Sequence, residues 1–349
     1  MGTPVSVSER PTVSVIVPAR NEEACLGACL ESLVVQDGVG FEIIVVDDGS
    51  SDRTRAIAES FAIVQVIEPG LLPAGWSGKN NAVTAGAKRA RGEWLLFTDA
   101  DTVHRPGSLA RALAEAREHH ADLLSYSPEQ EVHGFWEKAI MPVIFAELAG
   151  AYQPSEVSDP KSPAAAANGQ YLLVSREAYN AVGGHAAVAR SLLEDVALAR
   201  AVKVSGRRIF FRYGGDMVRA RMYRTLSQLT EGWTKNLALL FADPGWLAFR
   251  RFSEFLLIAG GIGVGLASWV NGNAGFAIAT SALSVTLWYF FLQRIHRAHF
   301  LWQANLLALF GLPFLAYLLL RSKIFHKRGT VSWKGRTYAG DATNVLPFS

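Results

Sequence analysis

The chain has 349 residues, of which half are hydrophobic and 19% are charged, and its mean hydropathy is +0.17. These values are high for a wholly soluble enzyme and low for a many-pass transporter. The formal net charge of +3 gives no basic excess of the kind that nucleic-acid binding needs, so we expect no nucleic-acid partner. The two cysteines, Cys25 and Cys29, lie four residues apart in a helical pattern, and we expect small buried side chains rather than a metal site.

The N-terminal segment 1–10 is polar and has no apolar core of a signal peptide. We therefore expect a polar tail, followed by a catalytic domain that stays on the cytoplasmic side of a membrane.

From residue 12 to about 127, short apolar strands alternate with helical stretches. The strands are expected at 13–17, 41–46, 62–67, 93–98 and 122–126, and the helices near 21–36, 52–60, 78–90 and 106–119. Alternation at this spacing is typical of βαβ units, which form a parallel sheet covered on both faces. The predicted fold class is therefore α/β with a mostly parallel sheet.

Acidic residues follow two of these strands where the strands end. Asp47 and Asp48 follow the second strand, and Asp99 and Asp101 follow the fourth. Ligands of an open parallel sheet bind beyond the carboxyl ends of its strands. Two carboxylates that face one ligand repel each other unless a cation lies beside them, and the usual cation is Mg²⁺ or Mn²⁺ bridging phosphates. The structural alternative is a solvated turn, or a cap for the helix that starts near Pro106.

Three segments, VSVIVPARNEE, IIVVDDGSSD and WLLFTDAD, follow one another in an order and spacing that resemble glycosyltransferase family 2. The resemblance covers a domain at 11–248. It implies the GT-A fold, a nucleotide-sugar donor whose base is most often uracil, and a divalent metal, Mg²⁺ or Mn²⁺.

Carried over by motif, the resemblance also assigns the donor site. The residues concerned are Pro18, Ala19, Asn21, Glu22, Asp47, Asp48, Lys79, Asp99 and Asp101. Asp48, with Asp47 beside it, would contact the base, while Asp99 and Asp101 would serve the ribose, the diphosphate and the metal. Lys79 of GWSGKNNA would lie near the nucleotide, although a lysine at a helix start is otherwise an ordinary surface charge.

The acceptor half of the site follows later in the chain. Inverting transfer to a hydroxyl needs a base to take its proton. In the family this base is the Asp of a Glu-Asp pair that begins a helix, and SLLEDVALARAVKV supplies Glu194 and Asp195. The preceding AAANGQYLLVSREAYNAVGG, which includes Gly169, resembles the family's acceptor-binding region. The structural alternative is a carboxylate that the helix dipole favours at this position.

The stretch RMYRTLSQLTEGWTKN departs from the Gln/Arg-x-x-Arg-Trp motif of members that elongate polysaccharides, because Gly232 precedes Trp233. This departure argues against a processive synthase. Arg221, Arg224 or Lys235 are the candidates to neutralise the diphosphate leaving group instead. GWSGKNNA, EGWTKN and WKGRTY resemble glycosyltransferases of carotenoid and hopanoid pathways, which implies a membrane lipid as acceptor.

After residue 250 the chain becomes apolar, with no charged residue from Phe255 to Gln293 and none from Phe300 to Leu320. A membrane span needs about 20 apolar residues. The sequence predicts a transmembrane region at 249–320, with helices at about 255–270, 274–293 and 300–320, and a basic tail at 321–349.

The flanking charges do not agree on a topology. Arg250 and Arg251 before the first segment, and Arg294 and Arg297 after the second, favour the cytoplasmic side. Three spans would then export the basic tail. Either one segment is re-entrant or interfacial, or an N-terminal span is lacking. Aromatic-rich helix patterns at 134–152 and 223–241 are further candidates for the interface.

The sequence therefore predicts an inverting, metal-dependent transfer of a sugar from a nucleotide-sugar, most often a UDP-hexose, to a lipid at the cytoplasmic membrane by a multi-pass protein. A processive polysaccharide synthase and a non-catalytic nucleotide-binding scaffold are the alternatives. A Rossmann dehydrogenase is disfavoured, because the first strand leads into PARNEE rather than a Gly-x-Gly-x-x-Gly turn.

Overall fold

The computed structural model describes residues 10–338, which form two compact units. The first holds residues 10–130 and 154–221, and the second holds 131–153 and 222–338. The predicted polar tail lies outside the described residues except for Arg10, and so does the end of the basic tail. The predicted domain boundary at residue 248 stays a prediction, since a compact unit and a functional domain need not end at the same residue.

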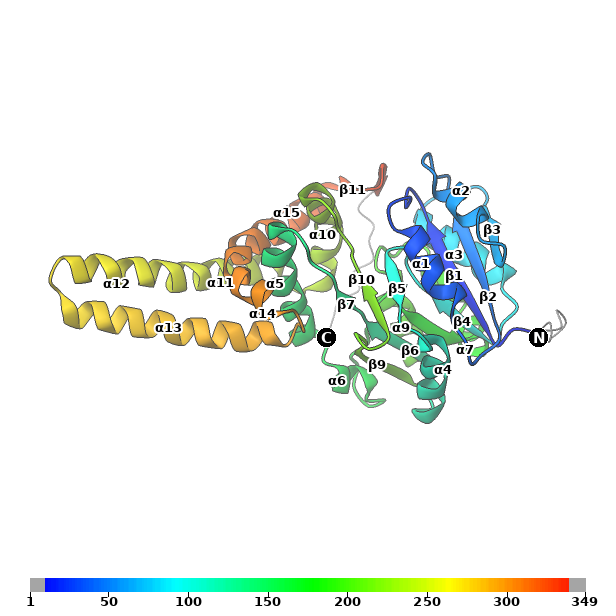
Figure 1. The fold of residues 1–349 in the computed structure, drawn as a ribbon, viewed down its shortest axis with the longest axis horizontal. Coiled ribbons are helices and arrows are strands. Elements are labelled where there is room, and N and C mark those ends of the chain that lie inside the picture. The colour runs from blue at the N-terminus through cyan, green and yellow to red at the C-terminus, as the bar shows by residue number, and fades with distance from the viewer. Residues whose placement is uncertain (1–9, 339–349) are drawn as a thin grey trace. The chain divides into compact units, whose positions relative to one another are not determined.

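The first unit is built on a seven-stranded sheet in the order β3-β2-β1-β4-β8-β6-β9, with a small second sheet in the order β5-β10-β7 (Figure 1). The strands are β1 Val13–Ala19, β2 Phe41–Asp47, β3 Val64–Ile67, β4 Trp94–Phe97, β5 Thr102–His104, β6 Leu123–Ser127, β7 Glu129–Gln130, β8 Leu172–Ser175, β9 Ile209–Tyr213 and β10 Val218–Ala220. The predicted strands are present, and β1 and β2 are buried along almost their whole length, as strands covered on both faces should be.

Helices flank this sheet, and apolar side chains of α1 and α4 enter its core. The helices of the first unit are α1 Leu26–Val34, α2 Thr54–Glu59, α3 Gly78–Arg89, α4 Ser108–Glu118, α6 Pro154–Ser158, α7 Arg176–Ala181, α8 Gly184–Ala187 and α9 Glu194–Val204. Cys29 is buried in the core and Cys25 is half-buried, and no disulfide joins them.

The strand directions gather the predicted site at one edge of the sheet. Strand β1 runs parallel to β2 and to β4, so their carboxyl ends meet at the same edge. Strand β8 runs antiparallel to β4, with Leu172 paired to Phe97. The residues just before β8 therefore lie beside the residues just after β4, and the fold is the mostly parallel α/β arrangement that the sequence predicts.

The second unit consists mainly of helices. They are α5 Phe135–Ala151, α10 Leu226–Leu240, α11 Pro244–Phe255, a π-helical turn Leu256–Gly260, α12 Gly261–Val270, α13 Ala274–His296, α14 Trp302–Leu307, a 3-10 turn Ala308–Phe310 and α15 Gly311–Arg328, followed by the hairpin of β11 Val331–Trp333 and β12 Arg336–Tyr338. In Figure 1 the α12–α13 pair extends from the rest of this unit, while α14 and α15 gather at its base with α5 and α11.

Three helical segments of the described chain are long and apolar enough to cross a membrane: Pro244–Val270, Ala274–His296 and Trp302–Arg328. They overlap the three helices predicted from the sequence at about 255–270, 274–293 and 300–320. They differ in how much of their apolar part is covered by protein, which is 11% and 17% for the first two and 44% for the third.

Small residues allow α12 and α13 to pack closely. A Cβ added at Gly265 would collide with the Ser281 hydroxyl of α13, whereas a Cβ at Gly263 would meet nothing within 4 Å. We expect Gly265→Leu to destabilise the helix pair by about 1–3 kcal/mol, as overpacking of a tight contact does. Thermal unfolding and protease resistance in detergent measure the effect, with Gly263→Leu as the matched control. Equal stability of the two variants would contradict this packing.

Candidate active site

The ends of β1 and β2 are joined by a dense set of local hydrogen bonds. The Asp48 backbone N–H donates to the Ala19 carbonyl at 2.9 Å, directly continuing the pairing of the two strands. Asn21 adopts a left-handed conformation with φ 53°, and its Oδ1 accepts the Ser51 N–H at 2.9 Å. Asp47 is buried, and its carboxylate accepts the Ser50 N–H at 3.2 Å. Asn21 and Asp47 thus shape the loops at this edge.

Two further residues of these loops were also predicted from sequence. Pro18 lines a pocket at the end of β1, and Glu22 donates its backbone N–H to Thr54 Oγ1 at 2.7 Å. Asp48 is buried at the end of β2, and its carbonyl accepts a hydrogen bond from Arg20 at 2.7 Å.

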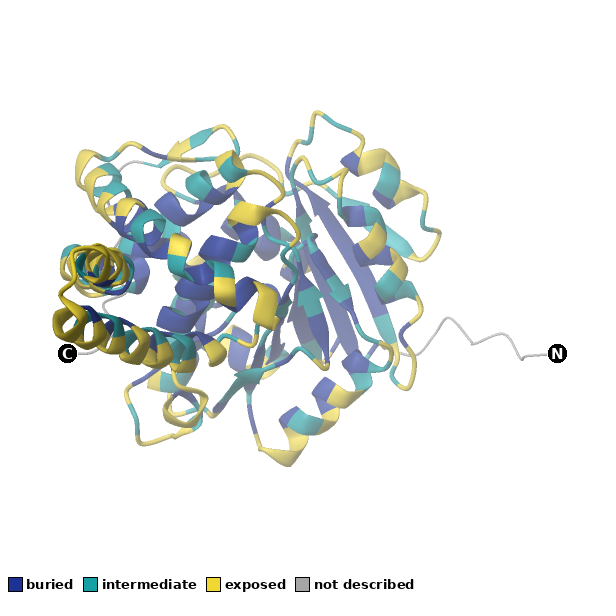
Figure 2. Ribbon diagram, turned by 60° about the vertical axis from the view of Figure 1, so that its left-hand side comes forward, coloured by how far each residue is buried: buried dark blue, intermediate teal, exposed yellow. Residues whose placement is uncertain are grey.

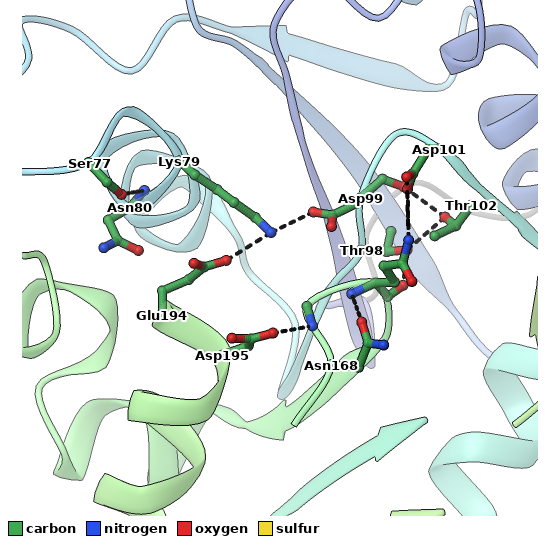
Figure 3. Close-up of polar contacts among 12 residues, drawn as sticks. Ser77, Lys79, Asn80, Thr98, Asp99, Asp101, Thr102, Asn168, Glu194 and Asp195 are labelled. Atoms are coloured by element: carbon green, nitrogen blue, oxygen red, sulfur yellow. Dashed lines mark hydrogen bonds and ion pairs between the residues drawn. The ribbon is translucent and has the colours of Figure 1, made fainter. Parts of the chain in front are cut away.

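Lys79 occupies the centre of a group of carboxylates (Figure 3). Ser77 caps α3 by accepting the Asn80 N–H, which fixes Lys79 in the first turn of the helix. Its ammonium lies 2.7 Å from Asp99 Oδ1 and 2.8 Å from Glu194 Oε1. Burial would favour the neutral amine, but the carboxylates of Asp99 and Glu194 raise the pKa of Lys79 well above its usual value. Lys79 is therefore a permanent cation that links α3, β4 and α9.

Asn80 holds the loop that leads into α9. Its side-chain amide is buried and donates to the carbonyls of Val188, Ala189 and Ser191 at 3.2, 2.9 and 3.0 Å. This loop ends where Glu194 begins α9. The Lys-Asn pair of GWSGKNNA thus positions the Glu-Asp pair from the other side of the site, a role that the sequence did not reveal.

Asp195 lies at the start of α9, beside the loop before β8. Its Oδ2 accepts the Gly169 N–H and its Oδ1 accepts the Val196 N–H, both at 2.8 Å. Burial and the neighbouring Glu194 carboxylate raise the pKa of Asp195 to about 6, and Lys79 opposes this rise. A carboxylate with a pKa near 6 is ionised at neutral pH and can accept a proton there.

Position 169 has little room for a side chain, which explains the glycine there. A Cβ at this position would lie 3.0 Å from Lys79 Nζ, 3.4 Å from Asp195 Oδ2 and 3.5 Å from Glu194 Oε1. A side chain here would push apart the cation and the two carboxylates. The Gly169 of the predicted acceptor region is thus part of the same cluster.

Asp99 and Asp101 lie two residues apart on the turn after β4. Asp101 does not cap the following helix, because α4 begins at Ser108 after Gly107 and Asp101 instead leads into β5. Both oxygens of Asp101 lie 3.3 Å from the Gln170 amide nitrogen.

The carboxylates of Asp99 and Asp101 are candidate ligands for a divalent cation. Within residues 10–338, no three His, Cys, Asp or Glu side chains come together in an arrangement that could hold a metal ion. Mg²⁺ commonly binds through one or two carboxylates, several waters and substrate phosphates. Asp99 and Asp101 fit an ion that arrives with a diphosphate, rather than an ion held by protein ligands alone.

A pocket at this edge is lined by the cluster and by apolar side chains. The lining residues are Pro18, Lys79, Val83, Phe97, Thr98, Asp99, Gly169, Leu172, His185, Glu194 and Asp195. His185 was not predicted from the sequence. Burial lowers its pKa to about 4, and its Nδ1 lies 3.1 Å from the Tyr179 hydroxyl, so it stays neutral near pH 7. Gln170 was missed as well, although it directly follows Gly169.

Besides Gly169, four residues were predicted for the acceptor and diphosphate region, and they are divided between the units. Arg221 belongs to the first unit, where its N–H donates to the Asp101 carbonyl at 3.2 Å. Arg224, Trp233 and Lys235 belong to the second unit. Trp233 is buried against Tyr223, and the Lys235 ammonium lies 5.4 Å from the centre of the Trp333 ring. The leaving-group role of Arg221, Arg224 and Lys235 stays a prediction, and the burial of Trp233 favours a packing role for that residue.

Known proteins are similar to this chain in sequence. Residues 14–183 match the model of Glycosyl transferase family 2. A 4,4'-diaponeurosporenoate glycosyltransferase of Staphylococcus aureus strain MRSA252 is 29% identical over 337 residues, which is 94% of this chain and 88% of that protein. The protein of the same name from strain USA300 is 28% identical over 344 residues, with the same coverage.

A solved structure extends the likeness to the fold. The mannosyltransferase PcManGT from Pyrobaculum calidifontis, in complex with GDP-Man and Mn²⁺, has a TM-score of 0.51 at 18% identity, covering 91% of this chain and 87% of that chain. Residues 14–183 therefore carry a family 2 glycosyltransferase domain with a GT-A-like fold, and the relatives that match 94% of the chain are named glycosyltransferases.

Proposed function

We propose that this glycosyltransferase moves a hexose from a nucleoside-diphosphate sugar, a UDP-hexose in the first place, to a hydroxyl of a membrane lipid of the carotenoid or hopanoid kind, with inversion at the sugar carbon. The observation that carries the proposal is the cluster of Lys79, Asp99, Glu194 and Asp195 at the carboxyl edge of the sheet. Lys79 and Asp99 suit a diphosphate and its metal ion. Asp195 suits the proton of the acceptor hydroxyl.

In the proposed reaction, Asp195 is the base. Its carboxylate takes the proton of the acceptor hydroxyl as the oxygen attacks the anomeric carbon, and the bond from that carbon to the diphosphate breaks. Gly169 and Val196 hold both carboxylate oxygens in place through their N–H groups. Glu194 raises the pKa of Asp195 and also binds Lys79, so it tunes and positions the base rather than acting as one.

On the donor side, the loops after β1 and β2 would hold the nucleotide, with Pro18, Ala19, Asn21, Glu22 and Asp48 nearest to it. Asp47 would act by holding the loop that presents Asp48. Lys79 supplies a fixed positive charge where the negative charge of the leaving diphosphate grows.

Asp99 and Asp101 would hold Mg²⁺ or Mn²⁺ together with the donor. When bound, the ion would neutralise the negative charge of the diphosphate. The Mn²⁺ in the complex of the Pyrobaculum mannosyltransferase supports this assignment by likeness of fold.

The lipid acceptor is supported by the named relatives and by the apolar helices. The relatives are called diaponeurosporenoate glycosyltransferases, and three segments of this chain are able to span a membrane. We place the catalytic domain on the cytoplasmic side of the cell membrane, because nucleotide-sugars are made in the cytoplasm. The name of the relatives also favours a second candidate, in which the acceptor group is a carboxylate.

Metal removal tests the donor half of the site. We expect EDTA to abolish transfer and added Mn²⁺ or Mg²⁺ to restore it. Asp101→Asn should raise the metal concentration needed for half-maximal donor binding by about tenfold or more, because a carboxylate ligand is lost. Calorimetric donor titrations at several metal concentrations give this value without measuring turnover. Full activity in EDTA would refute the metal dependence.

The pH dependence tests the base. Because burial and Glu194 raise the pKa of Asp195 to about 6, a growing fraction of Asp195 is protonated, and therefore inactive, as the pH falls below that value. We expect log kcat/KM to be level above pH 6 and to fall with unit slope below it. A lipid carrying a hydroxyl acceptor is used for this profile. A rate independent of pH between 4.5 and about 7 would contradict the assignment.

A further inference from the structure

We infer that, among the described helices, only the α12–α13 hairpin crosses the membrane, and that α14 and α15 lie in the interface of the same leaflet, bound to anionic lipid headgroups. The chain then enters and leaves the bilayer on one side. This inference rests on the proposed membrane association, but it does not depend on the sugar transfer.

Protein covers little of the hairpin, because 11% and 17% of the apolar windows of its two helical segments are buried, against 44% for the segment that contains α15. In Figure 2 it lies at the left, seen nearly end-on, and is mostly yellow, the colour of exposed residues. Leu266, Trp269 and Ile278 are exposed by 66%, 64% and 63%. Exposure of these apolar side chains to water would be unfavourable in free energy, whereas the hydrocarbon of a bilayer can cover them without further protein.

Helix α15 is different because one of its faces is already packed. Leu312, Leu315 and Leu319 are fully buried within the second unit, where α15 packs against α5, α10 and α11. A helix that spans a bilayer beside the hairpin would instead pack along α12 or α13.

Polar bonds tie α15 to a helix that carries charges. The Ser322 hydroxyl donates to the Thr234 carbonyl at 2.6 Å and accepts the Ala238 N–H at 2.8 Å. The Arg321 guanidinium donates to Thr234 Oγ1 at 3.1 Å. Helix α10 also carries Glu231 and Lys235, which are expensive to place in hydrocarbon. The α10–α15 pair therefore belongs at the level of water and headgroups.

An ion-pair cluster marks where the hydrocarbon part of the hairpin begins. Arg251 lies 2.8 Å from Glu147 and 3.0 Å from Glu254, and Arg294 lies 2.9 Å from Glu254. Arg251 and Glu254 stand just before the uncharged stretch, and Arg294 stands just after it. Because α5 and α11 carry this cluster and also pack against α15, α15 lies at the level of the cluster, outside the hydrocarbon.

The uncovered face of α15 fits an interface. Tyr317, Leu320 and Ile324 are exposed and lie on one side of the helix, where they would dip into the acyl boundary. Lys323 and Lys327 are exposed beside them and would reach the headgroups.

The charges of the two units identify the kind of lipid. The described residues of the second unit hold 13 lysines and arginines against 6 acidic residues, a formal charge of +7. The first unit holds 21 against 23, a formal charge of −2. The positive charge is thus concentrated in the unit that carries the membrane helices, as expected for contact with anionic headgroups. A tail that keeps Lys334 and Arg336 on the cytoplasmic side also satisfies the positive-inside tendency, which three spans would violate.

Cysteine accessibility in the full-length protein tests the topology. In a Cys25→Ser background, Asn273→Cys marks the tip of the hairpin, and Ser332→Cys marks the strand after α15. Both positions are exposed, whereas the remaining Cys29 is buried. A membrane-impermeant maleimide is added to intact spheroplasts and, separately, to inside-out vesicles.

We expect the Asn273→Cys protein to be labelled in spheroplasts and the Ser332→Cys protein to be labelled only in vesicles. Labelling of Ser332→Cys in spheroplasts would show that the third helix crosses, and it would overturn the inference. Absence of Asn273→Cys labelling in spheroplasts would overturn it too, since the hairpin would not cross. Thr337→Cys provides a second exposed position in case Ser332→Cys fails to fold. The labelling needs no donor or acceptor, so a failed transfer assay leaves this test standing.

Discussion

Asp195→Asn is expected to lower sugar transfer to a hydroxyl acceptor by about 100- to 10,000-fold, the range over which a general base contributes to catalysis. The amide has the shape of the carboxylate and can still accept the Gly169 N–H through its oxygen, but it cannot take a proton. Donor affinity should change little, because the change is made on the acceptor side of the cluster. Transfer rates and donor titrations on the same purified protein separate the two effects.

The control for this variant is Glu177→Gln, which removes a carboxylate whose side chain is 87% exposed. It should leave transfer unchanged. Wild-type turnover by Asp195→Asn with a hydroxyl acceptor would remove Asp195 as the base. The same pair also separates the two acceptor candidates, because a carboxylate acceptor is already ionised at neutral pH and needs no base. With a carboxylate acceptor the loss in Asp195→Asn should be much smaller.

Lys79→Met is expected to lower transfer by about 100-fold or more, the size of effect seen when one group that stabilises transition-state charge is removed. The variant keeps an unbranched side chain but leaves Asp99, Glu194 and Asp195 without the cation between them. Because Lys79 lowers the pKa of Asp195, its loss should also move the acidic limb of the pH profile to higher pH. The pH profile of kcat/KM measures this shift.

Lys88→Met is the matched control, since Lys88 lies on the same helix and is exposed. It should behave as the wild type. Lys79→Arg keeps the charge, so it should recover part of the activity and return the acidic limb toward pH 6. An acidic limb that does not move in a folded Lys79→Met protein would show that Lys79 is not coupled to Asp195.

Much of the first unit could be predicted because its signals are local. The apolar run before Asp47 and the WLLFT before Asp99 identify buried strands by composition, and parallel strands bring their carboxyl ends together. The ion pair between Lys79 and Glu194 could not be predicted, because it depends on the position of α3 relative to α9. Asn80 holds the loop before α9, and its three carbonyl partners are more than 100 residues away in the chain.

For the second unit, the sequence predicts which segments form apolar helices but not how these helices pack. Charge-free stretches revealed three apolar helices, since hydropathy alone is enough for that prediction. Hydropathy does not show which faces are covered by protein. Leu319 and Leu320 are equally apolar, yet the first is fully buried and the second is 47% exposed. Ser322 of α15 bonds to the backbone of α10 at Thr234 and Ala238, and nothing in the sequence marks it as a contact between these helices.

The proposed sugar transfer is tested most directly by supplying membranes that contain the protein with radiolabelled UDP-hexoses and identifying the lipid that becomes labelled. We expect a labelled lipid of low molecular mass that forms with wild-type protein and divalent metal, and that is absent with Asp195→Asn when the acceptor is a hydroxyl. Label that enters only a long polymer, or donor binding with no transfer from any UDP-hexose to lipid, would contradict it.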